Sequence, residues 1–211
     1  MTTSTSTYEA LLARDSQWEE LARFAGVGVS EPQNPAKVRG VFSYIDADAK
    51  IGERTIISPF CYIGPRVKIG DDCYIGPGSV IGGPGFGYEE GDNGEQVYRT
   101  HTQGVIIGDD VHIGANTCVD QGRHRPTEIR RGTRVDNLCH IAHNVIVGED
   151  CLIIAQSMLA GTVVIGHRTR VAPCAAVLDH ITVGKGCLVG MGSVVVRDVS
   201  DGQIVKGVPA K

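Results

Sequence analysis

A repeat of six residues runs through most of this chain and limits what it can fold into. A branched aliphatic residue recurs at every sixth position in three stretches: Ile45 to Ile81, Ile107 to Val119 and Ile129 to Val195. A period of six fits neither an amphipathic helix, which repeats about every 3.6 residues, nor a single strand, which alternates about every two. It is the period of a parallel β-helix built from hexapeptides. The sequence therefore predicts an all-β fold.

Two other positions of each hexad also follow a pattern. A small or β-branched residue stands two positions before the aliphatic one, as in Thr55, Cys73 and Thr133, and Gly often follows it, as in Gly64 and Gly76. We expect the aliphatic side chains to fill a narrow interior, with the small residues beside them. We expect the glycines to supply backbone freedom at the corners. Chance placement in a β-sandwich is the alternative, and twelve consecutive in-phase positions from Ile129 to Val195 argue against it.

These hexads resemble the left-handed β-helix family of hexapeptide-repeat acyltransferases. The resemblance covers residues 40–211 and implies a left-handed parallel β-helix, assembled as a homotrimer with sites between subunits. Because three hexads form one coil in that family, we expect about seven coils. We place the β-helix at residues 41–211, with a protruding loop at 82–106. Residues 1–40 are expected to form a tail, a short helix over 8–25 and a linker.

The composition limits which partners the protein can bind and in which cellular compartment we expect it. The formal net charge is −4 without a basic stripe, so we expect no nucleic-acid partner. No apolar run is long enough to span a membrane, and no signal peptide precedes the repeats. Of the seven Cys, five stand at the small position of a hexad, which predicts packing rather than disulfides or metal binding and fits a reducing cytoplasm. The five are Cys61, Cys73, Cys139, Cys151 and Cys187.

The repeat breaks twice, and long interruptions of a compact fold are often functional. The first break runs from Gly82 to Gly104 and carries Phe86 and Tyr88, which predicts an arm that closes over a ligand or stabilises a trimer. The second break, Gln121 to Arg125, is rich in Arg and His. It is either a phosphate contact or a solvated corner, and we favour the corner.

The strongest local signal is the pair His140 and His143, which flank the inward-facing Ile141 within a frame that begins Asp136-Asn137 and ends at Asn144. Neither His falls on a core position, so both should lie on the surface or at a corner. His180 follows His143 by two coils and one position, or roughly 10 Å along the axis at about 4.8 Å per coil. The two imidazoles are therefore expected to share one site.

This frame resembles the N-acyltransferases of lipid A assembly, and so do Gly85-Phe86-Gly87-Tyr88, Ile113-Gly114-Ala115-Asn116, Ala160-Gly161-Thr162 and Asp179-His180-Ile181. The resemblance implies that His143 is a general base and His180 a second active-site His. It also implies that Asn137 positions substrate and that the Gly161 amide lies near the thioester oxygen. Phe86, Tyr88, His140 and Asp136 are the expected substrate-binding residues. The residue that orients the His143 ring is open among Asp136, Asn137 and Asn144.

The chain departs from those enzymes at both ends. The residues before the repeats do not resemble their uridine-binding domain. The final residues, Val205-Lys206-Gly207-Val208-Pro209-Ala210-Lys211, look like the tail of hexapeptide transferases that use acetyl-CoA or another acyl-CoA. Lys206, Gly207 and Pro209 are therefore the expected acyl-CoA-binding residues.

The sequence thus predicts a cytoplasmic, acyl-CoA-dependent N-acyltransferase of a nucleotide-linked amino sugar, working in lipopolysaccharide or surface polysaccharide biosynthesis. His suits the base step because its pKa lies near the working pH. No metal is expected. The alternatives are a zinc enzyme like the γ-carbonic anhydrases, which share the fold, an O-acetyltransferase of a small hydroxyl substrate, and a scaffold without catalytic activity.

Overall fold

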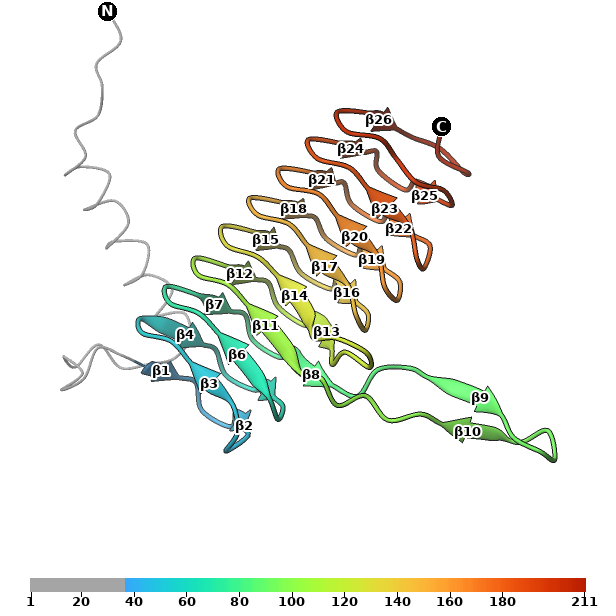
Figure 1. Ribbon diagram of the computed structural model, residues 1–211. Coiled ribbons are helices and arrows are strands. Elements are labelled where there is room, and N and C mark those ends of the chain that lie inside the picture. The colour runs from blue at the N-terminus through green and yellow to red at the C-terminus, as the bar shows by residue number, and fades with distance from the viewer. Residues whose placement is uncertain (1–36) are drawn as a thin grey trace, which may run out of the picture.

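The computed structural model describes residues 37–211, which wind into a parallel β-solenoid with three faces (Figure 1). Its first sheet has nine strands: β1 (Lys37–Arg39), β4 (Thr55–Ile57), β7 (Tyr74–Ile75), β12 (His112–Ile113), β15 (Arg134–Val135), β18 (Leu152–Ile153), β21 (Arg170–Val171), β24 (Leu188–Val189) and β26 (Ile204–Val205). The second has eight: β2 (Tyr44–Ile45), β5 (Tyr62–Ile63), β8 (Val80–Gly83), β13 (Cys118–Asp120), β16 (His140–Ile141), β19 (Met158–Leu159), β22 (Ala176–Val177) and β25 (Val194–Val195). The third has seven: β3 (Lys50–Ile51), β6 (Val67–Ile69), β11 (Val105–Ile107), β14 (Thr127–Ile129), β17 (Ile146–Val147), β20 (Val164–Ile165) and β23 (Thr182–Val183).

The predicted fold class is confirmed, but the count of about seven coils is too low, because the first sheet alone has nine strands. The extra strands lie at the two ends, where the aliphatic phase is lost. Arg39 of β1 pairs with Ile57, and Val205 of β26 pairs with Val189 although Val195 precedes it by ten residues. The expected helix over residues 8–25 lies outside the described residues.

The interior is made of the aliphatic residues that the repeat predicts. On the second sheet they form one row from coil to coil, and Ile63, Ile81, Ile141 and Leu159 in that row have no exposed surface. A buried aliphatic side chain of this size contributes roughly 1.5–3 kcal/mol relative to exposure. The row therefore supplies a core without helices.

The small position of the hexad has a hydrogen-bonding role that the sequence pattern does not reveal. Thr133 donates its hydroxyl to the Gly148 carbonyl at 2.7 Å and accepts the Cys151 backbone N–H at 3.1 Å, so one side chain joins two coils. Thr55, Ser79 and Thr169 make the same pair of bonds. The five Cys at this position are buried and free, as predicted. Where the residue is Thr or Ser, its short hydroxyl reaches the neighbouring coil, whereas Val67 and Val145 fill the same position without a donor.

The predicted backbone freedom of glycine is found at corners such as Gly78 and Gly132, which have positive φ, but not at most glycines that directly follow the aliphatic residue, Gly82 being an exception. Positive φ angles occur instead three residues before the aliphatic residue, as at Asp72, Asn144 and His180. Glycines such as Gly76 allow close stacking, since an added Cβ would lie 2.6 Å from the Gly114 carbonyl carbon. Coil-to-coil approach therefore selects Gly at this position.

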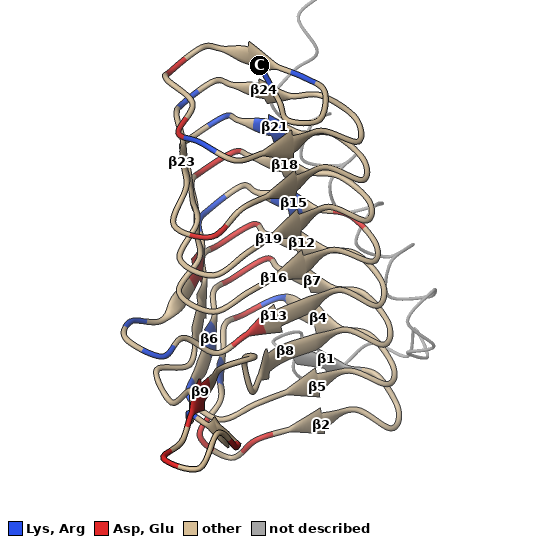
Figure 2. Cartoon of the chain, turned by 90° about the vertical axis from the view of Figure 1, so that its right-hand side faces the viewer, with Lys and Arg blue, Asp and Glu red and all other residues tan. Residues whose placement is uncertain are grey.

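The first break of the repeat leaves the solenoid as an arm, residues 84–104, that stands off from the coils in Figure 1 and lies in front of them in the view of Figure 2. Within it β9 (Tyr88–Glu90) and β10 (Gln96–Tyr98) pair as an antiparallel hairpin. The solenoid continues across the insertion, because β11 after the arm pairs with β6 in register, Val105 opposite Val67. The arm is therefore an addition to one corner of an unbroken solenoid.

Candidate functional site

His143 lies half-buried at the corner between β16 and β17, directly beside the buried Asn144. Oδ1 of Asn144 accepts the backbone N–H groups of Arg123 at 2.8 Å and His124 at 3.1 Å. Because two donors occupy this oxygen, the amide turns its NH2 group toward Nδ1 of His143, 3.0 Å away. Asn144 is therefore the residue that orients the imidazole.

This contact also decides the protonation state of the resting ring. A ring nitrogen that accepts an N–H carries no hydrogen itself, so the neutral imidazole holds its hydrogen on Nε2. An imidazolium carries a hydrogen on Nδ1 as well, and this hydrogen would point at the N–H of the Asn144 amide and repel it. The amide contact therefore favours the neutral ring.

The surroundings of His143 lower its pKa further. Burial is the main cause, followed by the positive charges that His101, Arg123, His124 and His180 carry or acquire nearby. The ring centroids of His101 and His143 are 4.8 Å apart. We expect His143 to be neutral at pH 7, as a proton acceptor must be.

Gly161, one coil further on, leaves room for the imidazole. A Cβ at Gly161 would lie 2.6 Å from Cε1 and 2.9 Å from Nε2 of His143, which is too close for any side chain. The Nε2 edge thus faces the backbone of the next coil, and the Gly161 carbonyl accepts the backbone N–H of His180 at 3.0 Å. The structure thus brings His143 and Gly161 together.

The second break of the repeat, residues 121–125, makes more contacts than the solvated corner that we favoured. Its Arg125 donates two guanidinium hydrogens to the Asn144 carbonyl, and its Arg123 donates to Glu89 of the arm at 2.8 Å. Glu89 also accepts from Arg99, and these two Arg lower the pKa of its carboxyl. The segment therefore connects the arm to the corner that holds His143.

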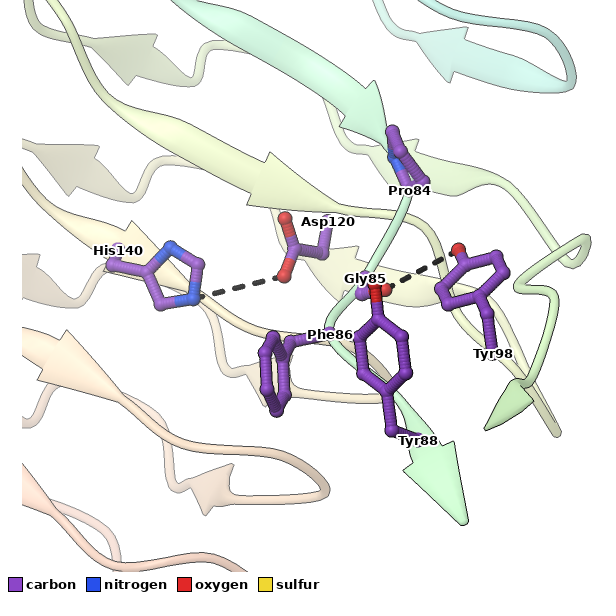
Figure 3. Close-up of a pocket in the computed structure, with 7 residues that line it drawn as sticks. All are labelled: Pro84, Gly85, Phe86, Tyr88, Tyr98, Asp120 and His140. Carbon is purple, nitrogen blue, oxygen red and sulfur yellow. Dashed lines mark hydrogen bonds and ion pairs between the residues drawn. The ribbon is translucent and has the colours of Figure 1, made fainter. Parts of the chain in front are cut away.

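A cavity of about 430 Å³ opens at the base of the arm and is lined by Pro84, Gly85, Phe86, Tyr88, Tyr98, Asp120 and His140 (Figure 3). The rings of Phe86, Tyr88 and Tyr98 follow one another at centroid distances of 5.1 and 5.4 Å. Tyr98 donates its hydroxyl to the Gly85 carbonyl at 3.3 Å. Three expected substrate-binding residues, Phe86, Tyr88 and His140, thus line one space.

Asp120 and His140 form the polar side of this cavity. Asp120 is 9% exposed, and one carboxylate oxygen lies 3.6 Å from Nε2 of His140. Burial raises the pKa of Asp120 to about 6, and the neighbouring His140 acts in the opposite direction. The pair thus offers a carboxyl that changes charge near neutral pH beside an imidazole.

His180 lies at the same corner of the solenoid as His143, two coils further along. Both Asn144 and His180 occupy the positive-φ position of their hexads, with Thr162 between them. The His180 side chain is 73% exposed, and its Nε2 lies 3.7 Å from an Asp179 carboxylate oxygen. Its placement on one edge with His143 agrees with the spacing argument.

Asp136 and Asn137 lie at a different corner, between β15 and β16. Both side chains join coils: Asn137 accepts the Ala115 N–H at 2.6 Å, and Asp136 accepts the N–H groups of Asn137 and Ala155. Within one chain the structure does not bring them to His143.

Lys206, Gly207 and Pro209 lie at the last coil, where β26 stacks on β24. Gly207 donates its backbone N–H to the Ser193 hydroxyl at 3.2 Å. A second cavity, of about 240 Å³, opens beside them and includes the charged residues Arg197, Asp198 and Lys211. None of the three expected residues lines that cavity itself.

No group of three or more His, Cys, Asp or Glu side chains within residues 37–211 is arranged to hold a metal ion. No helix in the same range has the length and apolar character needed to cross a membrane.

Sequence reasoning missed His101 and Asp120. His101 lies in the arm, where no period predicts its position. Asp120 follows the aliphatic Val119, at a hexad position that is often Gly, and a carboxylate there is forced close to the next coil. That substitution within the pattern is a signal that could have identified it.

Comparison with known protein families confirms the repeat. Residues 48–83 match the bacterial transferase hexapeptide (six repeats), and residues 99–137 and 180–197 match the hexapeptide repeat of succinyl-transferase. A probable UDP-3-O-acylglucosamine N-acyltransferase 2 of Arabidopsis thaliana is 40% identical over 133 residues, which are 63% of this chain and 44% of that protein. The UDP-3-O-acylglucosamine N-acyltransferase of Wolinella succinogenes is 36% identical over 132 residues, 63% of this chain and 42% of that enzyme. The chain thus spans less than half the length of these relatives.

Solved structures agree on the fold. The UDP-N-acetylglucosamine acyltransferase from Campylobacter jejuni superimposes with a TM-score of 0.67 at 20% identity, over 82% of this chain and 73% of that one. The corresponding enzyme from Bacteroides fragilis also gives 0.67, at 22% identity, over 82% and 72%. The chain therefore has the left-handed β-helix fold of proteins built from transferase hexapeptide repeats, and its sequence is similar to that of the UDP-3-O-acylglucosamine N-acyltransferases.

Proposed function

We propose that this protein transfers an acyl group from a thioester to the amino group of a nucleotide-linked sugar. The observation that carries the proposal is the half-buried imidazole of His143, which Asn144 contacts at Nδ1 and for which Gly161 leaves room. The similarity to enzymes named UDP-3-O-acylglucosamine N-acyltransferases supports the class of acceptor. We place the reaction in lipopolysaccharide or surface polysaccharide biosynthesis in the cytoplasm.

In this reaction the amine nitrogen attacks the thioester carbonyl, a C–N bond forms and the C–S bond breaks. The proton that the amine loses passes to Nε2 of His143 and then to the departing thiolate, so the products are an amide and a free thiol. A positioned base contributes about 10²–10⁴-fold to such a step. The Gly161 amide is the proposed donor to the oxyanion.

Proton uptake at Nε2 requires the ring to carry its own hydrogen on Nδ1. Asn144 then has to present Oδ1 to the ring, and it gives up the backbone bonds from Arg123 and His124. Each such bond is worth about 0.5–1.5 kcal/mol net. Asn144 therefore sets the cost of bringing His143 into its basic form.

The aromatic cavity is the proposed site for the sugar. Phe86 and Tyr88 offer apolar faces to a ring, and Asp120 and His140 offer hydrogen bonds to hydroxyl groups. This assignment keeps the nucleotide sugar at the base of the arm, on the side of the solenoid that carries His140.

The donor is proposed to be an acyl-CoA that lies along the solenoid toward Lys206, Gly207 and Pro209. Three coils separate β16 from β25, or roughly 14 Å at about 4.8 Å each, so an extended thioester arm spans the distance. In a homotrimer, the corner of Asp136 and Asn137 would come from a neighbouring subunit. That arrangement accounts for their distance from His143 within one chain.

The test is an assay of the purified chain with acyl-CoAs of several lengths and with UDP-, dTDP- and GDP-linked amino sugars, read by mass spectrometry. We expect a product that gains the acyl mass and resists hydroxylamine, which separates an amide from an ester. His143→Ala should lower kcat by at least about tenfold, whereas His167→Ala, which removes a His paired with Glu149, should not. A full-rate His143→Ala enzyme would refute the base assignment.

A further inference from the structure

His101 is a buried imidazole that the proposed chemistry does not use. It lies in the arm after β10, is 4% exposed and packs at a centroid distance of 4.8 Å from His143. Among the described residues neither ring nitrogen has a hydrogen-bond partner of good geometry, and a contact with the Arg99 backbone acts to raise the pKa of the ring. A buried polar group without a partner is costly, so its retention calls for a reason.

The arm is shaped around this ring. A Cβ at Gly85 would lie 2.8 Å from Cδ2 of His101, and a Cβ at Gly87 would lie 2.6 Å from Cε1. Tyr98 lies beside it at a centroid distance of 6.2 Å. Two glycines and one aromatic residue of the arm thus form a seat for His101.

The seat holds the His101 ring against His143 while the arm lies against the solenoid. The arm itself is attached through Glu89, which bonds Arg123 of the segment that also anchors Asn144. A shift of the arm would therefore disturb both neighbours of the His143 ring, the tilted imidazole of His101 and the amide of Asn144.

The titratable groups that lower the pKa of His143 are all bases, and two carboxylates lie beside them: Glu89 accepts from Arg123, and Asp179 lies 3.7 Å from His180. His101 faces His143 from the arm, Arg123 and His124 from the segment after β13, and His180 from the coil two positions on; Asn144 is neutral. Burial also lowers the pKa of His101, and Arg123 and His124 act in the same direction. Two adjacent imidazoles in such a place are both neutral at pH 7.

We propose that His101 is a positioning residue that holds the His143 imidazole in place and shields its face from water when the arm is docked. The proposal rests on the proposed function of His143, but its first test needs no turnover. His101 touches the ring of His143 rather than the ligand, so it acts on the reaction through that ring.

The test is an NMR titration of the His143 imidazole in the full-length chain, assigned by the signal that His143→Gln removes. In the unmodified protein His143 should titrate below the ordinary value of about 6.5. In His101→Ala its titration should move up toward that value, because water and free space replace the buried ring. His101→Phe keeps the packing and should move it less. His167→Ala is the control and should leave it unchanged.

A titration of His143 in His101→Ala that superimposes on that of the unmodified protein would overturn the proposal. If His101→Ala does not fold, Gly85→Ala provides the second variant, since its Cβ displaces the His101 ring from its seat. Kinetics add a separate readout: the acid limb of the kcat profile should follow the shifted titration. A shifted titration in a protein that transfers no acyl group would sink the proposed function and leave the positioning role intact.

Discussion

Nδ2 of Asn144 lies 3.0 Å from Nδ1 of His143, and the Asn144 oxygen is held by two backbone N–H groups on its other side. The amide therefore presents a donor to the ring, and the resting imidazole keeps its hydrogen on Nε2. One neutral side chain thus decides both the orientation and the proton distribution of the residue that we assign as the base.

Asn144→Asp should raise the pKa of His143. A carboxylate accepts from the two backbone N–H groups and from Nδ1–H together, and its charge stabilises an imidazolium. The acid limb of the kcat/KM profile should move to higher pH with it. NMR titration of His143 measures the shift, and Asn144→Leu, which offers neither charge nor acceptor, should not produce it. A His143 pKa that stays where it was in the Asp variant would contradict the assignment.

Gly161→Ala should lower kcat by about tenfold to a hundredfold while leaving thermal stability close to that of the unmodified protein. The new methyl group would lie 2.6 Å from Cε1 of His143, so the ring has to move, and small displacements of reacting groups have effects of this size. In a His143→Ala background the same substitution should have no further effect on kcat. Additive losses in the double variant would mean that Gly161 acts elsewhere.

Asp120→Asn should change how stability depends on pH. The folded-state pKa of Asp120 is raised to about 6, above an unfolded value of about 3.9. The folded protein therefore binds more protons in this range, and the stabilisation present below about pH 4 is lost as the pH rises through 6. Asn cannot ionise, so the variant should lose less stability between pH 4 and 7, by roughly 2 kcal/mol. Urea unfolding at several pH values checks this, with His140→Gln as a companion that removes the opposing charge.

Thr133→Val should lower the free energy of unfolding by about 2–3 kcal/mol, because it leaves the Gly148 carbonyl and the Cys151 N–H without their side-chain partner inside the solenoid. Thr133→Ser keeps the hydroxyl and loses only a methyl group, worth about 1 kcal/mol. Equal losses in the two variants, measured by urea unfolding, would show that packing rather than the hydrogen bonds matters here.

The fold was predictable because its determinants are local and repeated. Ile63, Ile141 and Leu159 lie in the interior as the six-residue period requires. The role of Gly76 was predicted wrongly, since a sequence does not distinguish a glycine chosen for its φ angle from one chosen for close stacking. The coil count failed at the ends, where Arg39 and Val205 are out of pattern.

The candidate site was only partly predictable. Spacing along the axis places His143 and His180 on one edge, because coils of constant length convert sequence separation into distance. The contact between His101 and His143 depends on how the arm folds back, and an insertion has no period to reveal that. For the same reason Asp136 and Asn137, close to His143 in sequence, lie at another corner.

The pairing of Val67 with Val105 across the arm has an evolutionary consequence. The ladder closes as though residues 84–104 were not there, so mutation can lengthen, shorten or exchange the arm without altering the register of any coil. The arm is thereby separable from the ladder of the solenoid, so this insertion can diverge in sequence and length while the repeated interior stays the same.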